Sequence, residues 1–175
     1  MNPTPGIDFA RLSLKDALDL AVLVEEEAEE RYLELTLQME MHRTPRAAAF
    51  FRFMATNEKK HGEELQARRS KLFGDEPRRV RRAMLFDVEA PDYDEARAFM
   101  SPREALEAAM RSEQKAQAFF EAALPHLSDP EVRSLFEELR QEEVHHQALI
   151  EKEAGKLPAE DPLPADAFED EPAAL

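Results

Sequence analysis

The stretch EEVHHQALI, residues 142–150, sets two glutamates ahead of two histidines, and each glutamate has a histidine three positions later. The pairs are Glu142 with His145 and Glu143 with His146. On a helix, residues three apart share a face, so both side chains of a pair can reach one cation. Carboxylate oxygen and imidazole nitrogen suit divalent iron or manganese. Glu58 and His61 form a third pair of this kind. The motif is short and recurs by chance, so its position in the fold must decide its meaning.

Four helical segments are predicted to position these pairs, at about residues 13–41, 44–73, 101–124 and 129–154. A capping residue followed by proline opens three of them, at Thr44, Ser101 and Asp129. Gly74 is a stop signal for the second helix. The links after the first and third helices are short, whereas residues 74–99 form a long connector. Short links join antiparallel neighbours and a long one can cross a bundle. We therefore predict an all-α, antiparallel four-helix bundle with a long crossover between helices two and three.

The chain also repeats itself as two helical hairpins of one design. When Thr44–Pro45 is aligned on Asp129–Pro130, Glu58 falls on Glu143 and His61 falls on His146. The first and third helices align in the same way: Glu25 falls on Glu113 and Tyr32 on Phe120. By contrast, Glu142 and His145 fall on Asn57 and Lys60, which form no such pair. The repeat thus favours Glu143 and His146 as the metal-binding pair of the opening stretch, and it places Glu142 and His145 at the edge of the site.

The candidate ligands lie on the apolar stripes of their helices, which points them into the core. They are Glu25, Glu58, His61, Glu113, Glu143 and His146. A buried charge costs several kcal/mol unless it is paired or bound to metal, and too few basic residues lie near the stripes to offset four carboxylates. One glutamate from each of two helices, with Glu-x-x-His from each of the other two, is the ligand set of di-iron and di-manganese carboxylate bundles. The competing interpretation is a metal-free helical scaffold with buried polar residues.

This pattern resembles the rubrerythrin branch of the ferritin-like superfamily, from about Ser13 to Ala154. The resemblance implies a ferritin-like bundle, two iron ions and redox chemistry with hydrogen peroxide, oxygen or ferrous iron. It implies that Glu25, Glu58 and His61 serve mainly one ion, and that Glu113, Glu143 and His146 serve the other. Tyr32 resembles the tyrosine that family members place beside the metal pair, where it would orient a ligand or carry an electron; core packing is the alternative role.

Two departures from rubrerythrins shift the expected chemistry. The chain has no cysteine, so it lacks their rubredoxin domain and would need an external electron donor. Ala116 stands where they carry an additional glutamate. A six-ligand site more closely resembles ferritin and bacterioferritin centres, and this resemblance implies oxidation of ferrous iron, coupled to reduction of peroxide or oxygen, in an oxidative-stress or iron-handling role. The alternatives are an iron-storage or iron-binding protein without fast turnover and a di-manganese catalase-like enzyme.

Composition and charge limit what we expect of the partners, the location and the domain organisation of the protein. A net charge of -15 argues against nucleic-acid binding. No apolar run approaches the roughly 20 residues that span a membrane, and no signal peptide is evident, so we expect a cytoplasmic protein. Residues 1–12 are interpreted as an N-terminal extension, 13–156 as the folded domain and 157–175 as a disordered acidic tail. We expect a homodimer that uses the 74–99 connector, and we expect the basic cluster Arg78–Arg82 to pair with acidic neighbours or a second subunit.

Overall fold

A computed structural model describes residues 7–84 and 100–157 of the chain. Residues 85–99 of the connector and the predicted disordered tail beyond Leu157 lie outside these described residues. The described parts are helical and contain no strand. Within them, no helix combines the length and the apolar character that crossing a bilayer requires.

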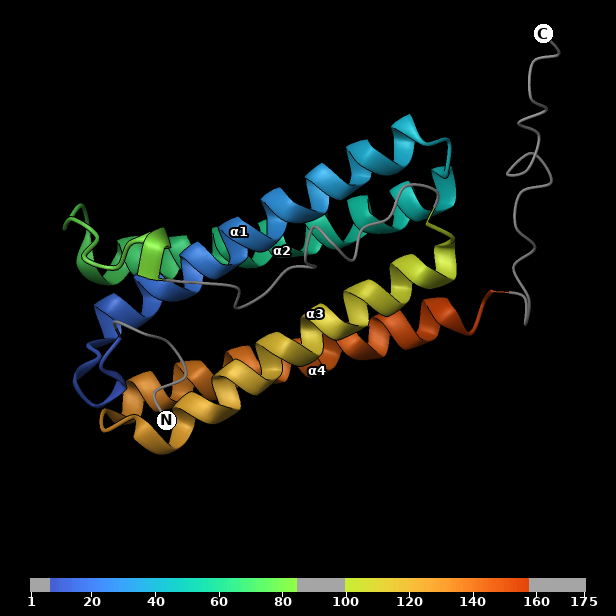
Figure 1. The fold of residues 1–175 in the computed structure, drawn as a ribbon. Helices are drawn as coiled ribbons and strands as arrows, with labels where there is room; N and C mark the ends of the chain where they lie inside the picture. Colours follow the sequence, from blue (N-terminus) through green and yellow to red (C-terminus); the bar gives the residue numbers. More distant parts are fainter. Residues whose placement is uncertain (1–6, 85–99, 158–175) are drawn as a thin grey trace, which may run out of the picture.

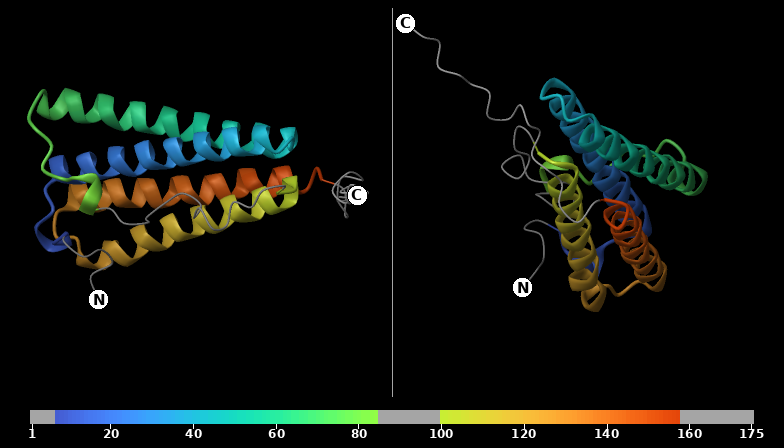
Figure 2. Two further views of the ribbon diagram at one scale, coloured as in Figure 1. Left: turned by 45° about the horizontal axis from the view of Figure 1, so that its top comes forward. Right: turned by 90° about the vertical axis from the view of Figure 1, so that its right-hand side faces the viewer.

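The described residues contain four long helices: α1 (Leu14–Met41), α2 (Pro45–Phe73), α3 (Pro102–Ala123) and α4 (Pro130–Ala154). Three short 3-10 helices accompany them: η1 (Phe9–Arg11), η2 (Arg82–Met84) and η3 (Leu124–His126). α1 packs mainly on α2, and α3 packs mainly on α4. Figure 1 shows that each pair is an antiparallel hairpin and that α2 and α3 run in the same direction. The two further views of Figure 2 show the hairpins stacked against each other. The predicted ferritin-like four-helix bundle is confirmed.

Local sequence signals explain where the helices begin. The Ser101 hydroxyl accepts a hydrogen bond from the backbone of Glu104, whose side chain accepts one in return from the backbone of Ser101. Asp129 caps α4 by accepting from the backbone of Glu131 at 2.8 Å. Thr44 differs from these capping residues, because its hydroxyl makes no capping hydrogen bond to α2 and instead donates to the Met39 carbonyl oxygen at 3.0 Å. Its side chain therefore secures the turn between α1 and α2.

The apolar core consists of two separate clusters, one at each end of the bundle. The first includes Leu18, Leu20, Phe120, Phe136 and Leu139. The second includes Tyr32, Leu35, Phe51, Met54 and Leu106. On every helix, the predicted metal-binding residues fall between the stretches that contribute to these two clusters. A polar layer thus crosses the middle of the bundle.

The end of the bundle where α1 begins is closed by an additional segment. Phe9 of η1 is 1% exposed and makes edge-to-face contacts with Phe119 and Phe136, both at ring-centroid separations of 6.1 Å. Residues 7–12, interpreted from the sequence as part of an extension, therefore contribute to the core.

Buried and exposed ion pairs hold the start of the connector against α1. The carboxylate of Asp19 lies 2.8 Å from both Lys15 and Arg69, and Lys15 also donates to the Pro77 carbonyl oxygen. Further along, Arg78 lies 3.2 Å from Glu26. The basic cluster thus pairs, at least in part, with acidic neighbours in its own chain. The buried basic residues Lys15 and Arg69 both pair with Asp19, at a distance from the central glutamates along α1 and α2.

Candidate metal centre

Each of the four long helices contributes at least one side chain to the polar layer in the middle of the bundle. α1 contributes Glu25, α2 contributes Glu58 and His61, α3 contributes Glu113, and α4 contributes Glu143 and His146. The four glutamates and His146 are at most 3% exposed, whereas His61 is half-buried. Gly62 allows α2 to approach α1 closely here, since a Cβ atom at this position would lie 3.3 Å from the Cβ of Glu25. The structure therefore brings all six predicted residues into one region of the core.

The side chains form small clusters in which one ligand atom from each residue lies within 4.8 Å of the others. Glu113, Glu143 and His146 form one cluster, and Glu58, His61 and His146 form a second. The first matches the set that the resemblance implies for one ion. The second differs from the implied set, because Glu58 is grouped with both histidines and Glu25 is grouped elsewhere. His146 belongs to both clusters and so lies at the centre of the arrangement.

The imidazole of His146 faces carboxylates from three helices. Its Nδ1 atom lies 2.9 Å from Glu113 Oε2, 3.7 Å from Glu58 Oε1 and 3.8 Å from Glu143 Oε2. The His61 and His146 rings are stacked and nearly parallel, with centroids 5.0 Å apart and an interplanar angle of 2°. The two histidines that the internal repeat relates are thus adjacent in space, as two ligands of one centre would need to be.

Tyr32 adjoins the cluster and is fully buried. Its hydroxyl donates a hydrogen bond to Glu113 Oε1 at 2.7 Å, while the other oxygen of that carboxylate faces His146. Its ring stacks on Phe51 at a centroid separation of 6.0 Å. Tyr32 therefore both packs in the core and orients a candidate ligand, so the two roles considered from the sequence are compatible.

The protonation equilibria of the site reflect buried negative charge. Burial raises the pKa of Glu25 from 4.5 to about 8, although a hydrogen bond with Glu58 opposes the shift. Burial lowers the pKa of His61, and the neighbouring His146 lowers it further. Burial would also lower the pKa of His146, but the hydrogen bond and charge of Glu113 outweigh that effect and raise it. The imidazole nearest the carboxylates thus keeps its proton to a higher pH than an ordinary histidine does.

The donor set fits a divalent metal centre. Glu25 Oε2, His61 Nδ1 and His146 Nε2 are buried atoms that have no hydrogen-bond partner among the described residues. Buried polar atoms are normally satisfied, and groups that lack a partner commonly mark a place for an ion or water. Carboxylate oxygens with two imidazoles and no sulfur are ligands that suit iron or manganese.

One residue of this region was not among the predicted ligands. Glu142 forms a third cluster with Glu25 and His61, again with ligand atoms within 4.8 Å of one another. The repeat had placed Glu142 at the edge of the site because its counterpart is Asn57. No sequence signal showed that its side chain turns towards the other hairpin. Its partner in the opening stretch, His145, is exposed.

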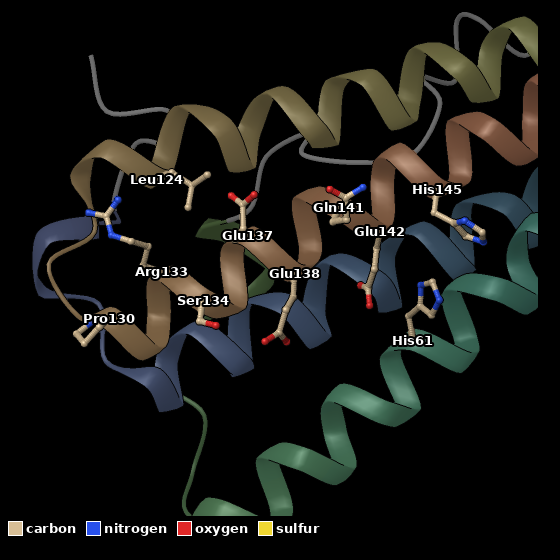
Figure 3. A pocket seen from close by; sticks show the side chains of 10 residues that line it. All are labelled: His61, Leu124, Pro130, Arg133, Ser134, Glu137, Glu138, Gln141, Glu142 and His145. Carbon is tan, nitrogen blue, oxygen red and sulfur yellow. The ribbon is translucent and has the colours of Figure 1, made fainter.

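A surface groove of about 890 Å³ runs along α4 and reaches the site. Glu138, Glu142, His145 and His61 are among its lining residues. In Figure 3, the Glu142 carboxylate extends from α4 towards the His61 imidazole on α2. Solvent therefore reaches the cluster from this side.

A four-helix bundle whose core holds clustered carboxylates and histidines is the architecture of ferritin-like metal-binding proteins. Comparison with known proteins identifies the branch: the family model described as rubrerythrin matches residues 16–154. The chain belongs to the rubrerythrin family, whose members bind a di-iron centre.

The solved structures include a protein similar to this chain along almost its whole length. It is an uncharacterized conserved protein from Magnetospirillum magnetotacticum MS-1, with 29% identity and a TM-score of 0.65. The match covers 86% of this chain and 99% of the other. No protein of curated function shows significant similarity to the chain. Family and fold are thus defined, whereas the reaction must be argued from the site.

Proposed function

We propose that this protein binds two iron ions and oxidises ferrous iron while hydrogen peroxide or oxygen is reduced. The convergence of four buried glutamates with His61 and His146 in one region of the core carries this proposal. With peroxide, the reaction balances as two ferrous ions, one hydrogen peroxide and two protons giving two ferric ions and two waters. When bound, iron supplies the one-electron steps of this chemistry.

The residues of the chain have separate tasks in this proposal. Glu113, Glu143 and His146 would hold one ion, and Glu58 and His61 would hold the other together with Glu25. The Tyr32 hydroxyl fixes the orientation of the Glu113 carboxylate. Glu58, Glu113 and Glu143 are shielded from bulk solvent, while the groove beside His61 would admit a small oxidant such as peroxide.

Repeated turnover requires electrons from outside the chain. The sequence contains no cysteine and so holds no rubredoxin-type iron site. We therefore propose that a separate reductant returns the iron to its ferrous form. Without such a donor, the proposed reaction would stop after the bound ferrous iron had been consumed.

Anaerobic loading followed by an oxidant tests the proposal. Protein loaded with two ferrous ions per chain is expected to oxidise both on addition of one equivalent of peroxide, with a rise in near-ultraviolet ferric absorbance. Free ferrous iron in the same buffer serves as the control for uncatalysed oxidation. Iron that binds but oxidises no faster than this control would instead identify an iron-binding or storage protein. Peroxide disproportionation by manganese-loaded protein alone would support the catalase-like alternative.

Replacing Tyr32 with phenylalanine is expected to slow the oxidation about three- to tenfold while two ions still bind. The variant keeps the ring that stacks on Phe51 and removes only the hydrogen bond to Glu113. A hydrogen bond to a charged group contributes roughly 1.5–3 kcal/mol, so the metal-free protein should also unfold more easily. Stopped-flow absorbance gives the rate and elemental analysis gives the metal content. Loss of both ions would contradict a role limited to orienting Glu113.

A further inference from the structure

The cluster of Glu25, His61 and Glu142 provides a donor set that the six-ligand interpretation does not use. Its three side chains come from α1, α2 and α4, and their ligand atoms lie within 4.8 Å of one another. Figure 3 shows the Glu142 carboxylate directed across the groove at the His61 ring. A residue of the second hairpin therefore lies beside the half of the site that the first hairpin supplies.

Two buried atoms of this cluster lack the hydrogen-bond partners that buried polar groups normally have. Glu25 is 3% exposed and its Oε2 atom has no hydrogen-bond partner among the described residues, and the same holds for His61 Nδ1. The neighbouring charges that act most strongly on Glu142 are those of His146 and of two further carboxylates, Glu138 and Glu64. No lysine or arginine is among them. A divalent cation between Glu25, His61 and Glu142 would satisfy all three groups at once.

The internal repeat makes this extra carboxylate unique to one half of the site. The position equivalent to Glu142 on α2 is Asn57, whose amide donates to the Phe53 carbonyl oxygen of its own helix at 3.1 Å. The cluster of Glu113, Glu143 and His146 therefore receives no corresponding donor from the first hairpin. The two hairpins share one sequence pattern, but they thus supply unequal sets of metal-binding side chains.

We propose that Glu142 is a seventh ligand, which completes the coordination of the cation held by Glu25 and His61. The inference rests on the proposed di-metal function and deepens it, because it makes the two cation positions chemically different. Glu142 adds one carboxylate ligand to the cation position next to the groove. No equivalent carboxylate of the first hairpin is available to the position formed by Glu113, Glu143 and His146.

Anaerobic titration with cobalt(II) tests the assignment without relying on activity. Calorimetry gives the affinity of each position, and the visible absorbance of cobalt reports its coordination. Glu142→Gln is expected to weaken one of the two positions by about ten- to a hundredfold and to change its absorbance, while the other position keeps its affinity. The substitution preserves side-chain size and removes charge from an acidic cluster, so the melting temperature of the metal-free protein should not fall.

Glu138→Gln is the matched control, because Glu138 lies one turn earlier on α4 and lines the same groove but belongs to none of the clusters. It should leave both affinities unchanged at high ionic strength, where long-range charge effects are screened. Wild-type affinities in Glu142→Gln, or an equal loss in both variants, would overturn the assignment and leave the proposed function intact. Absence of cobalt and iron binding by the wild-type protein would overturn the proposed function itself, and this inference with it.

Discussion

Replacing His146 with alanine is expected to lower metal content from two ions per chain to one or fewer, whereas His145→Ala should leave both ions bound. His146 is 2% exposed, and its Nδ1 atom faces Glu58, Glu113 and Glu143. It belongs to two of the clusters, and it is the histidine that both of them share with buried glutamates from α2, α3 and α4. Even residues that only support ligands cost about 10–100-fold in affinity when they are removed, so loss of a direct ligand should cost at least about a hundredfold.

The two substitutions form a matched pair because they remove the same side chain from neighbouring positions on α4. His145 is exposed and lines the groove, outside all three clusters. Metal per chain after desalting gives the stoichiometry, and circular dichroism verifies that both variants remain helical. The opposite pattern, with metal lost in His145→Ala and retained in His146→Ala, would refute the assignment drawn from the internal repeat.

The stability of the metal-free protein is expected to increase as the pH falls from about 8 to 6.5. Over this range the Glu25 carboxyl, whose pKa burial raises to about 8, takes up a proton in the folded chain. The unfolded chain, with an ordinary pKa of 4.5, does not. The unfolded state therefore binds fewer protons, and stability falls as pH rises. One proton contributes about 1.4 kcal/mol per pH unit, or up to roughly 2 kcal/mol over the whole range. The raised pKa of His146 acts in the same direction, whereas His61 opposes it below its ordinary pKa of 6.5.

Bound metal should reverse the dependence of stability on pH, so that the metal-loaded protein becomes more stable as the pH rises. Cations require deprotonated carboxylates and neutral imidazoles, so their binding releases protons and strengthens as pH rises. At a free metal concentration a hundred times the dissociation constant, binding adds about 2.7 kcal/mol to the free energy of unfolding. Thermal melts at several pH values, with a chelator or with ferrous iron under anaerobic conditions, would show the two opposite slopes. Glu25→Gln should flatten the slope of the metal-free protein. A metal-free protein that becomes steadily more stable up to pH 8 would contradict the buried-carboxyl explanation.

The four-helix bundle could be predicted from the sequence because the residues that mark the ends of its helices act locally. Proline after a capping residue marked the start of three helices, and each observed helix begins and ends within one residue of its predicted range. The repeat then related the two hairpins and separated Glu143 and His146 from their neighbours. The family and the ferritin-like bundle are confirmed, whereas the homodimer, the cytoplasmic location and the tail stay predictions.

The features that were missed depend on contacts between distant parts of the chain. Phe9 precedes the first helix and has no periodic neighbours, so nothing local shows that it packs on Phe119 and Phe136. Glu142 lies beside the apolar stripe of α4, and only the distance between hairpins decides whether its carboxylate reaches His61. Periodicity assigns a residue to a face of its own helix and does not measure the separation of two helices.

The division of the core into two apolar clusters has a consequence for how this site can change. Each end of the bundle is closed by its own packed side chains, and the donors sit in the layer between them. The helices are thus held in place before any cation arrives, unlike small zinc domains that fold only around their metal. Substitutions within the middle layer can alter the number or kind of donors while both ends keep the scaffold assembled. Such a scaffold allows the two hairpins to carry unequal metal positions, and to change them one residue at a time, while the bundle stays folded.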